Sequence, residues 1–368
     1  MKDMKRYNPN TFNALHAATA YLLFWAMMFG VSMLFVPIME HVSPGADLSP
    51  YLCLESVLIA AGLALVTAIM ALAAKVNPVN GGGFLSRKGC GVEMLMAAVL
   101  IFGMAILFSP LAESFAETIE ELRTLLRLPA GAEPSIEYGG WFLLYYLILV
   151  PVLPAIFEEL LFRGVILKGF MQFGKMPAVI LSALLFALAH GSYQQFIYQF
   201  LVGLVIGALV VETKNIVVGM VAHFANNFFA SWSVLVYGFA LGRNGEEIYV
   251  SIISIMTFLL GTVCLIAGLV YFVKRMFHSQ KYPERARGDI AATFVVHDMV
   301  SGTLLEERPW YSCGALTEKH AEQRCYLAEN NGRGKLNRKA GIFPAVLVLA
   351  IGLAAALFVA IGAFIGGV

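Results

Sequence analysis

Long apolar runs are the feature that most restricts how this chain of 368 residues can fold. A helix needs about 20 apolar residues to cross the bilayer core, where unpaired backbone groups are not tolerated. Seven runs reach that length, namely 12–39, 52–75, 92–115, 141–167, 216–239, 251–273 and 342–368, and two shorter runs lie at 177–190 and 196–211. We therefore predict an all-α, polytopic transmembrane helical bundle of about 8–9 membrane segments.

The overall composition agrees with a membrane protein and excludes several other classes. The chain is 59% hydrophobic and 13% charged, whereas a soluble domain is about 45–50% apolar and about 25% charged. Its formal net charge is +1, and no basic patch with interleaved aromatic residues occurs. We therefore expect the lipid bilayer as a partner and no nucleic acid.

The distribution of lysine and arginine predicts the orientation and the organisation of the chain. Basic residues gather in alternate loops, which places the N-terminus in the cytosol, and a prokaryotic cell membrane is expected. Three spans and an amphipathic outer loop near 113–128 make up 1–140, and the core that carries the intramembrane polar residues is 141–240. A further span at 241–275, a small polar cytosolic segment at 276–341 and a last span at 342–368 complete the chain.

The polar segment contains two short stretches that read as strands. They are TFVVHD at 293–298 and GTLLEE at 302–307. We expect a small appendage or a linker here.

Three charged residues stand close together inside the fourth apolar run. A charged side chain near the bilayer centre costs about 2.5–3.5 kcal/mol on insertion scales. Glu159 and Arg163 are four residues apart, so they share a helix face and are expected to form a structural ion pair. Glu158 is rotated about the helix axis by about 100° from Glu159, so it has no ion-pair partner on its own helix. Pro151 and Pro154 weaken the helix just before it and open space beside it. An interhelical lock of the three charges is the purely structural alternative.

Three further polar residues lie at a similar depth. At 1.5 Å per residue, Glu158, His190, His223 and Asn227 fall about 12–20 Å from the predicted cytosolic helix ends. His223 and Asn227 are four residues apart and share one face. We therefore expect one shared cavity, although a packed histidine and polar contacts between helices are the plainer interpretations of each residue alone.

This set of side chains is suited to the attack of water on an amide. A carboxylate and a histidine can hold and deprotonate water, while a second histidine and an asparagine can bind the developing oxyanion. Two histidines and a glutamate can also bind zinc, which keeps a metal-dependent reaction open. Neither GxSxG nor HExxH occurs in the sequence.

Three motifs in this order resemble the CAAX protease and bacteriocin-processing family of intramembrane glutamic endopeptidases. They are EELLFRG at 158–164, FALAH at 186–190 and HFANN at 223–227, and the resemblance covers 141–232. It implies that Glu158 is the general base and that His190 assists it. It also implies that His223 and Asn227 form the oxyanion hole and that Glu159 and Arg163 support the site. The family is regarded as metal-independent, so no cofactor is expected.

The sequence therefore predicts an intramembrane peptidase whose partner is a lipid-anchored or membrane-associated peptide or protein, with no oligomeric state assigned. A catalytically silent regulator or immunity-type protein of the same fold is the alternative from another class, and a zinc-dependent protease is the second. A proton-coupled transporter is disfavoured, because such proteins often consist of repeated halves and no internal repeat is present.

Overall fold

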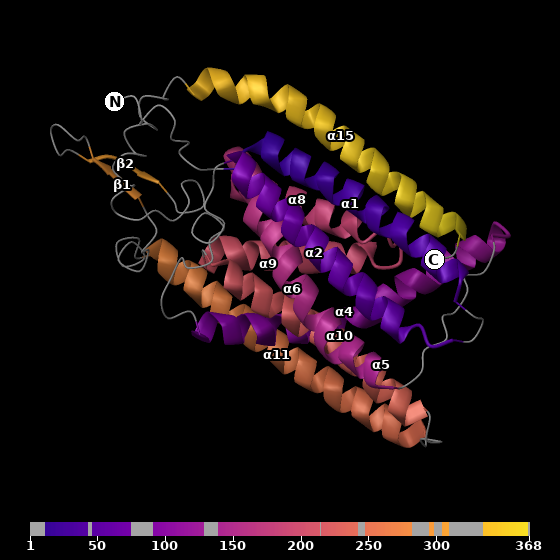
Figure 1. Ribbon diagram of the computed structural model, residues 1–368. Helices are drawn as coiled ribbons and strands as arrows, with labels where there is room; N and C mark the ends of the chain where they lie inside the picture. The colour runs from indigo at the N-terminus through magenta and orange to yellow at the C-terminus, as the bar shows by residue number, and fades with distance from the viewer. Residues whose placement is uncertain are drawn as a thin grey trace.

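The computed structural model describes 12–42, 46–74, 91–128, 139–213, 215–241, 247–281, 294–297, 304–308 and 334–366. Within these residues the chain forms a bundle of helices together with one small hairpin (Figure 1). The long helices are α1 (Ala14–Glu40), α2 (Ser49–Ala74), α4 (Gly91–Leu125), α10 (Ile216–Leu241), α11 (Glu247–Lys281) and α15 (Gly334–Gly366), and the shorter ones are α8 (Lys175–Ala189) and α9 (Phe196–Thr213).

One helical rod supplies the centre of the bundle. It consists of α5 (Gly140–Leu144), a π-helical stretch (Tyr145–Leu149), α6 (Val150–Leu161), a second π-helical stretch (Phe162–Leu167) and α7 (Lys168–Phe170), and a 3₁₀ turn follows (Met171–Phe173). The first π-helical stretch ends just before Pro151, and the second contains Arg163. Wide turns of this kind often lie at functional sites.

The predicted fold class is confirmed, and each of the nine apolar runs contains a helix among the described residues. Seven described helices are long and apolar enough to cross a membrane, and these include the 18-residue α9. α8 has only 15 residues, or about 22 Å of helix. α10 has 26 residues but falls outside the seven, because His223, Asn226 and Asn227 interrupt its apolar character. The protein is a helical, multi-pass membrane bundle.

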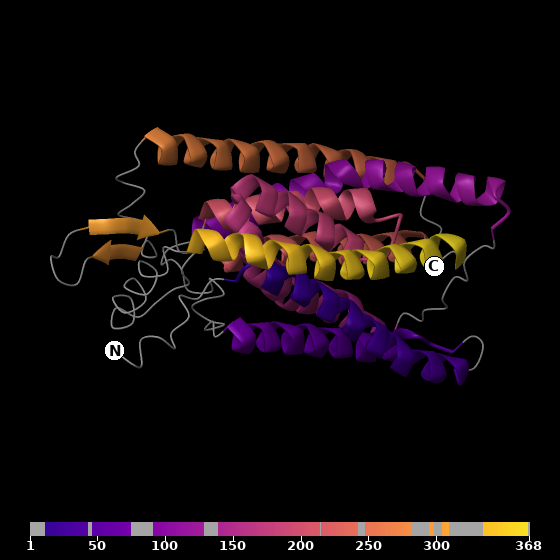
Figure 2. The same cartoon turned by 90° about the horizontal axis from the view of Figure 1, so that it is seen from above.

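Two hydrophobic clusters lie on opposite sides of the α6 rod. The first joins α1, α2, α8 and α15 to the rod around Tyr21, Phe24 and Phe162. The second joins α4, α9, α10 and α11 around Ile101, Ile206 and Val218. Accordingly, α15 runs along α1 at one side of the bundle, and α11 runs along α4 at the other (Figures 1 and 2).

The α4–α11 pair shows how closely two of these backbones approach. A Cβ atom placed on Gly103 would lie 2.3 Å from the backbone nitrogen of Leu265. In membranes, where burial of apolar surface adds little between helices, such close packing of small residues supplies much of the attraction. Gly103 is therefore required to hold α11 against α4.

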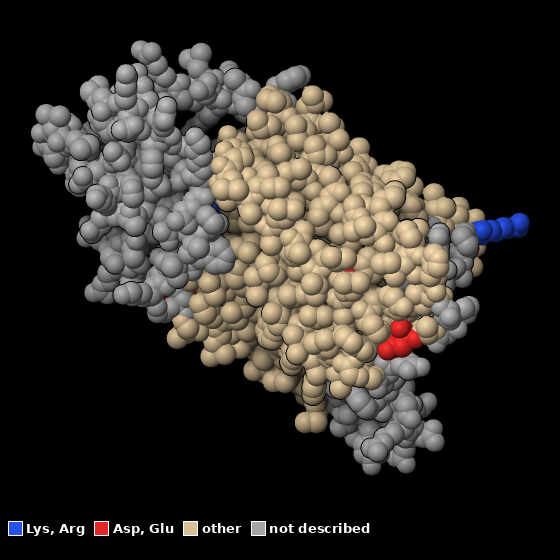
Figure 3. All heavy atoms as spheres, viewed as in Figure 1, with Lys and Arg blue, Asp and Glu red and all other residues tan. Residues whose placement is uncertain are grey.

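The surface agrees with a position inside a membrane. On the face shown in Figure 3, the described charged side chains gather near one end, and the broad middle is nearly all uncharged. Large apolar side chains are exposed on the outer helices, such as Leu72 (78%) on α2 and Phe358 (71%) on α15. These side chains face the position that lipid tails would occupy.

The stretch near 113–128 and the hairpin within 276–341 can be compared with what the sequence predicts. The stretch near 113–128 is no separate helix, since α4 continues through it to Leu125. The two short strands are confirmed as β1 (Phe294–His297) and β2 (Leu304–Arg308), which pair antiparallel with an irregularity at Val296/His297. The N-terminal basic residues and most of 276–341 lie outside the described residues, so the cytosolic location expected for both stays a prediction.

Candidate active site

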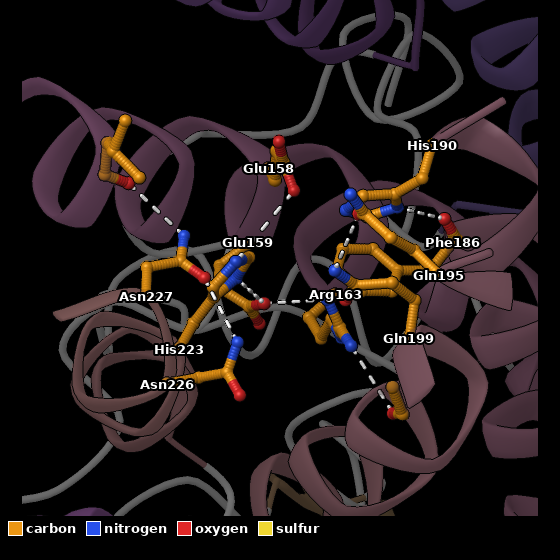
Figure 4. A network of polar contacts seen from close by, with 12 residues as sticks. Glu158, Glu159, Arg163, Phe186, His190, Gln195, Gln199, His223, Asn226 and Asn227 are labelled. Atoms are coloured by element: carbon orange, nitrogen blue, oxygen red, sulfur yellow. Dashed lines mark hydrogen bonds and ion pairs between the residues drawn. The ribbon is translucent and has the colours of Figure 1, made fainter. Parts of the chain in front are cut away.

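Glu159 lies at the centre of a polar network formed by side chains from α6, the adjoining π-helical stretch, α8, α9 and α10 (Figure 4). Its side chain and that of Arg163 are both 0% exposed, and Arg163 Nη1 lies 2.6 Å from Glu159 Oε1. Such a short distance is typical of a charge-assisted hydrogen bond. The ion pair that the spacing of four residues predicts is therefore confirmed, and it is fully buried.

Arg163 also contacts two neighbouring helices. Its Nη2 atom donates a hydrogen bond of 3.2 Å to the carbonyl of Gly203 in α9. Its Cζ atom lies 4.5 Å from the ring centre of Phe186 in α8, and an aromatic face attracts a guanidinium. The buried cation therefore links α8 and α9 to the α6 rod.

His223 in α10 lies between the two glutamates. Its Nδ1 atom is 2.9 Å from Glu159 Oε1, and its Nε2 atom is 3.9 Å from Glu158 Oε2. An ionised carboxylate only accepts hydrogen bonds, so Nδ1 carries a proton and donates a hydrogen bond to Glu159. As a result, Nε2 can donate only when the ring carries both protons, and in the neutral ring it accepts.

Glu158 is the less buried of the two carboxylates. Its side chain is 19% exposed, and its 3.9 Å separation from His223 is too long for a direct hydrogen bond. Its Oε2 atom is buried, yet it accepts no hydrogen bond from any residue that the structure describes. A buried oxygen of this kind is costly for folding. Glu158 is therefore the carboxylate without an ion-pair partner on its own helix, as its position around the helix predicts.

His190 directly follows the last residue of α8. Its Nδ1 atom lies 2.8 Å from the Phe186 carbonyl, which can only accept, so the neutral ring leaves Nε2 as an acceptor. Among the described residues, no direct hydrogen bond joins His190 to Glu158. Instead, the ring of His190 packs against Phe186, and Phe186 also contacts Arg163 and His223. Phe186 is thus the packing centre of the site.

The loop after His190 is held by contacts with α4 and α15. Gly191 has a φ of +64°, and a Cβ atom there would lie 2.9 Å from Val359 of α15. Tyr193 donates a hydrogen bond of 2.7 Å to Glu120 of α4. Burial, and after it this hydrogen bond, raises the pKa of the Tyr193 hydroxyl, so it remains a donor at neutral pH.

Arg123 fastens the end of α15 to the same loop. Its Nη1 atom donates to the carbonyls of Ala363 and Phe364 in the last turn of α15, where helix carbonyls lack partners within the helix. Its Nε atom lies 3.2 Å from Glu120 Oε2, and Tyr193 packs edge-on against Phe364. We call Glu120, Arg123, Tyr193 and Phe364 the loop clasp.

Asn227 lies one turn beyond His223 on α10. Its Nδ2 atom donates a hydrogen bond of 3.2 Å to the Val150 carbonyl, and its Oδ1 atom accepts one of 3.1 Å from Asn226. The carbonyl of Val150 is available because Pro154, four residues later, has no N–H group. Pro154 therefore acts on the site as well as on the helix, since its missing N–H group leaves the Val150 carbonyl free to bind Asn227.

Gly219 provides the space that Glu159 occupies beside α10. A Cβ atom at Gly219 would lie 3.0 Å from Glu159 Oε2 and 2.5 Å from Val210 Cγ2. Gly219 precedes His223 by four residues, so both lie on the same face of the helix. This spacing was the one signal in the sequence that could have indicated its role.

The structure brings Glu158, Glu159, Arg163, His223 and Asn227 into one network, with His190 joined to it through Phe186. The sequence analysis missed the contributions of Phe186, of Asn226 and of Tyr198 in α9, whose hydroxyl donates a hydrogen bond of 2.6 Å to Asn226 Oδ1. No group of three or more His, Cys, Asp or Glu side chains among the described residues is arranged to hold a metal ion.

Comparison with known proteins identifies a matching family for this region. Residues 140–229 match the family model described as Type II CAAX prenyl endopeptidase Rce1-like. The matched segment contains Glu158, His190, His223 and Asn227, together with the ion pair. Neither the curated proteins nor the solved structures gave a match to the chain.

Proposed function

Because residues 140–229 form a domain of the type II CAAX prenyl endopeptidase Rce1-like family, we propose that this membrane protease cleaves its substrate by the attack of a water molecule activated by Glu158. The observation that carries the proposal is the state of the two carboxylates. Glu159 is 0% exposed and accepts hydrogen bonds from both Arg163 and His223 at Oε1, with only its Oε2 left without a donor among the described residues. Glu158 is 19% exposed, and its Oε2 accepts no hydrogen bond within the described chain. Glu158 is therefore the carboxylate that can hold a reactant.

In the first step, Glu158 takes a proton from water as the water oxygen bonds to the carbonyl carbon of the scissile peptide. The free Nε2 atom of neutral His190 can accept a second hydrogen bond from the same water and orient it. The carbonyl becomes a tetrahedral oxyanion. Collapse of this intermediate breaks the C–N bond, and the proton held by Glu158 passes to the leaving amine.

The oxyanion is stabilised by two donors from α10. Asn227 has a second amide N–H besides the one that binds Val150. Since His223 donates its Nδ1 proton to Glu159, it serves the oxyanion only as a doubly protonated ring. Glu159 and Arg163 then act by holding and charge-balancing that ring. Preorganised donors of this kind are worth about 10²–10³ in kcat each.

The substrate class follows from the surroundings of the site and from the name of the matched family. The network lies among helices whose outer faces are apolar, so a lipid-anchored or membrane-associated peptide can reach it from the membrane. A CAAX-type tail, with or without a prenyl group, is the first substrate to test.

The test compares Glu158→Gln with wild-type protein on a fluorogenic CAAX peptide prepared in farnesylated and unmodified forms. We expect cleavage to be lost in the variant while its melting temperature in detergent is retained. Glu121→Gln, at an exposed glutamate near the end of α4, is the matched control and should cleave normally. Full activity of Glu158→Gln would refute the role of Glu158. Activity lost to a chelator and restored by zinc would instead support the metal-dependent alternative.

A further inference from the structure

The Asn227 amide belongs to a chain of hydrogen bonds that runs across α9 and α10. Tyr198 of α9 donates to Asn226 Oδ1 at 2.6 Å. Asn226 Nδ2 donates to Asn227 Oδ1 at 3.1 Å, and Asn227 Nδ2 donates to the Val150 carbonyl at 3.2 Å. Asn226 is 4% exposed, so water does not easily replace its partners.

At one end of this series of hydrogen bonds stands a group that can only accept. A backbone carbonyl can only accept, and Pro154 removes the N–H group that would otherwise bind the Val150 carbonyl within the helix. The Val150 carbonyl therefore requires the NH₂ end of Asn227. If the Asn227 amide were reversed, its oxygen would face the oxygen of Val150.

The orientation of Asn227 fixes the orientation of the next side chain in the series of hydrogen bonds. With its NH₂ group toward Val150, Asn227 turns its oxygen toward Asn226, which must then present its own NH₂ group. The oxygen of Asn226 faces Tyr198, whose hydroxyl must donate. Each amide has two orientations in isolation. The Val150 carbonyl selects one for both, and the Tyr198 hydroxyl, which can donate or accept, completes the series as a donor.

We propose that Asn226 and Tyr198 are positioning residues that hold the Asn227 amide with its second N–H group toward the reacting carbonyl. This inference rests on the proposed function, in which Asn227 is an oxyanion donor. Neither residue touches the substrate. Both act through Asn227, because the hydrogen bond from Asn226 to its oxygen and the hydrogen bond to the Val150 carbonyl together hold the amide in one orientation.

The two residues differ in how directly their loss reorients Asn227. Asn226→Asp preserves the shape of the side chain, but a carboxylate cannot donate to Asn227 Oδ1 and instead attracts the Asn227 NH₂ group. Tyr198→Phe removes only the hydroxyl, which leaves Asn226 less firmly held. We expect kcat to fall about 10–100-fold in Asn226→Asp and less in Tyr198→Phe, with KM changed by less than about 2-fold, because an oxyanion donor acts mainly on the transition state.

The experiment measures kcat and KM on the CAAX peptide for Asn226→Asp, Tyr198→Phe, Asn227→Ala and the combination of Asn226→Asp with Asn227→Ala. Tyr51→Phe, at the start of α2, is the control for loss of a hydroxyl. Residues that act through Asn227 should lower kcat no further once Asn227 is replaced. Thermal unfolding in detergent identifies any variant that fails to fold, and Tyr198→Phe keeps the test decisive if Asn226→Asp does.

The outcomes separate this inference from the proposed function. If Asn227→Ala lowers kcat while folded Tyr198→Phe and Asn226→Asp do not, the positioning role is refuted and the oxyanion role stands. If the combined variant loses the product of the two single effects, Asn226 acts independently of Asn227 and the inference is likewise refuted. Unchanged kcat in both Asn227→Ala and Glu158→Gln would refute the proposed function itself.

Discussion

Replacing Glu159 by glutamine should destabilise the protein far more than its one-atom change suggests. The substitution leaves Arg163 uncompensated in a position where neither partner is exposed. Removing one partner of a buried ion pair costs about 3–5 kcal/mol. Glutamine keeps one acceptor oxygen for Arg163 and His223, so we expect the free energy of unfolding to fall by about 3 kcal/mol, the lower end of that range.

A double substitution shows whether the buried charge is the cause. Arg163→Met alone strands the Glu159 carboxylate with His223 as its remaining partner, and it should also cost about 3 kcal/mol or more. Glu159→Gln combined with Arg163→Met removes both charges. The main remaining loss is then the donor to the Gly203 carbonyl, which costs about 1–3 kcal/mol. The double variant should therefore be more stable than the sum of the single effects requires.

The measurement is reversible unfolding in mixed detergent micelles for the wild type, the two single variants and the double variant. The coupling energy is the difference between the double effect and the sum of the single effects. Strictly additive losses, or a Glu159→Gln protein as stable as the wild type, would refute the conclusion that a compensated buried pair holds the centre of the site.

Two further substitutions test contacts next to the site. Gly219→Ala would put a Cβ atom 2.5 Å from Val210 Cγ2 and 3.0 Å from Glu159 Oε2, so it should cost about 1–3 kcal/mol through overpacking and reduce cleavage. Gly30→Ala, where nothing lies within 4 Å, is its control, and equal effects of the two would contradict the steric argument. Arg123→Gln removes the cation from the last turn of α15, a contact worth about 0.3–2 kcal/mol. Hydrogen exchange should then quicken in that turn and in the loop 191–195, and unchanged exchange in both would exclude a role for the clasp.

The sequence predicted those parts of the fold that follow from local spacing. Apolar runs located the membrane helices, because the thickness of the bilayer fixes their length. The separation of four residues predicted the Glu159–Arg163 pair, because a helix places such residues one above the other. The two strands of the hairpin lie within or beside the two stretches that read as possible strands.

The contacts between distant residues could not be predicted in this way. Glu159 and His223 are 64 residues apart, and no periodicity states that one nitrogen of His223 is already occupied. The same holds for Asn227, whose partner is a backbone carbonyl freed by Pro154. The sequence showed that Pro154 weakens its helix, but the side chain that uses the freed carbonyl depends on how α10 packs against the rod.

The loop clasp has a consequence for the order in which the protein is assembled. Glu120 is synthesised before the residues of the candidate site, and Phe364 long after them, yet both contact Tyr193 in the loop that follows His190. The loop therefore reaches its final arrangement only when α15 has entered the membrane and docked beside α1. During biosynthesis the nascent chain would contain the side chains of the candidate site before this loop is fixed, so that maturation of the protein is tied to the insertion of its last described helix.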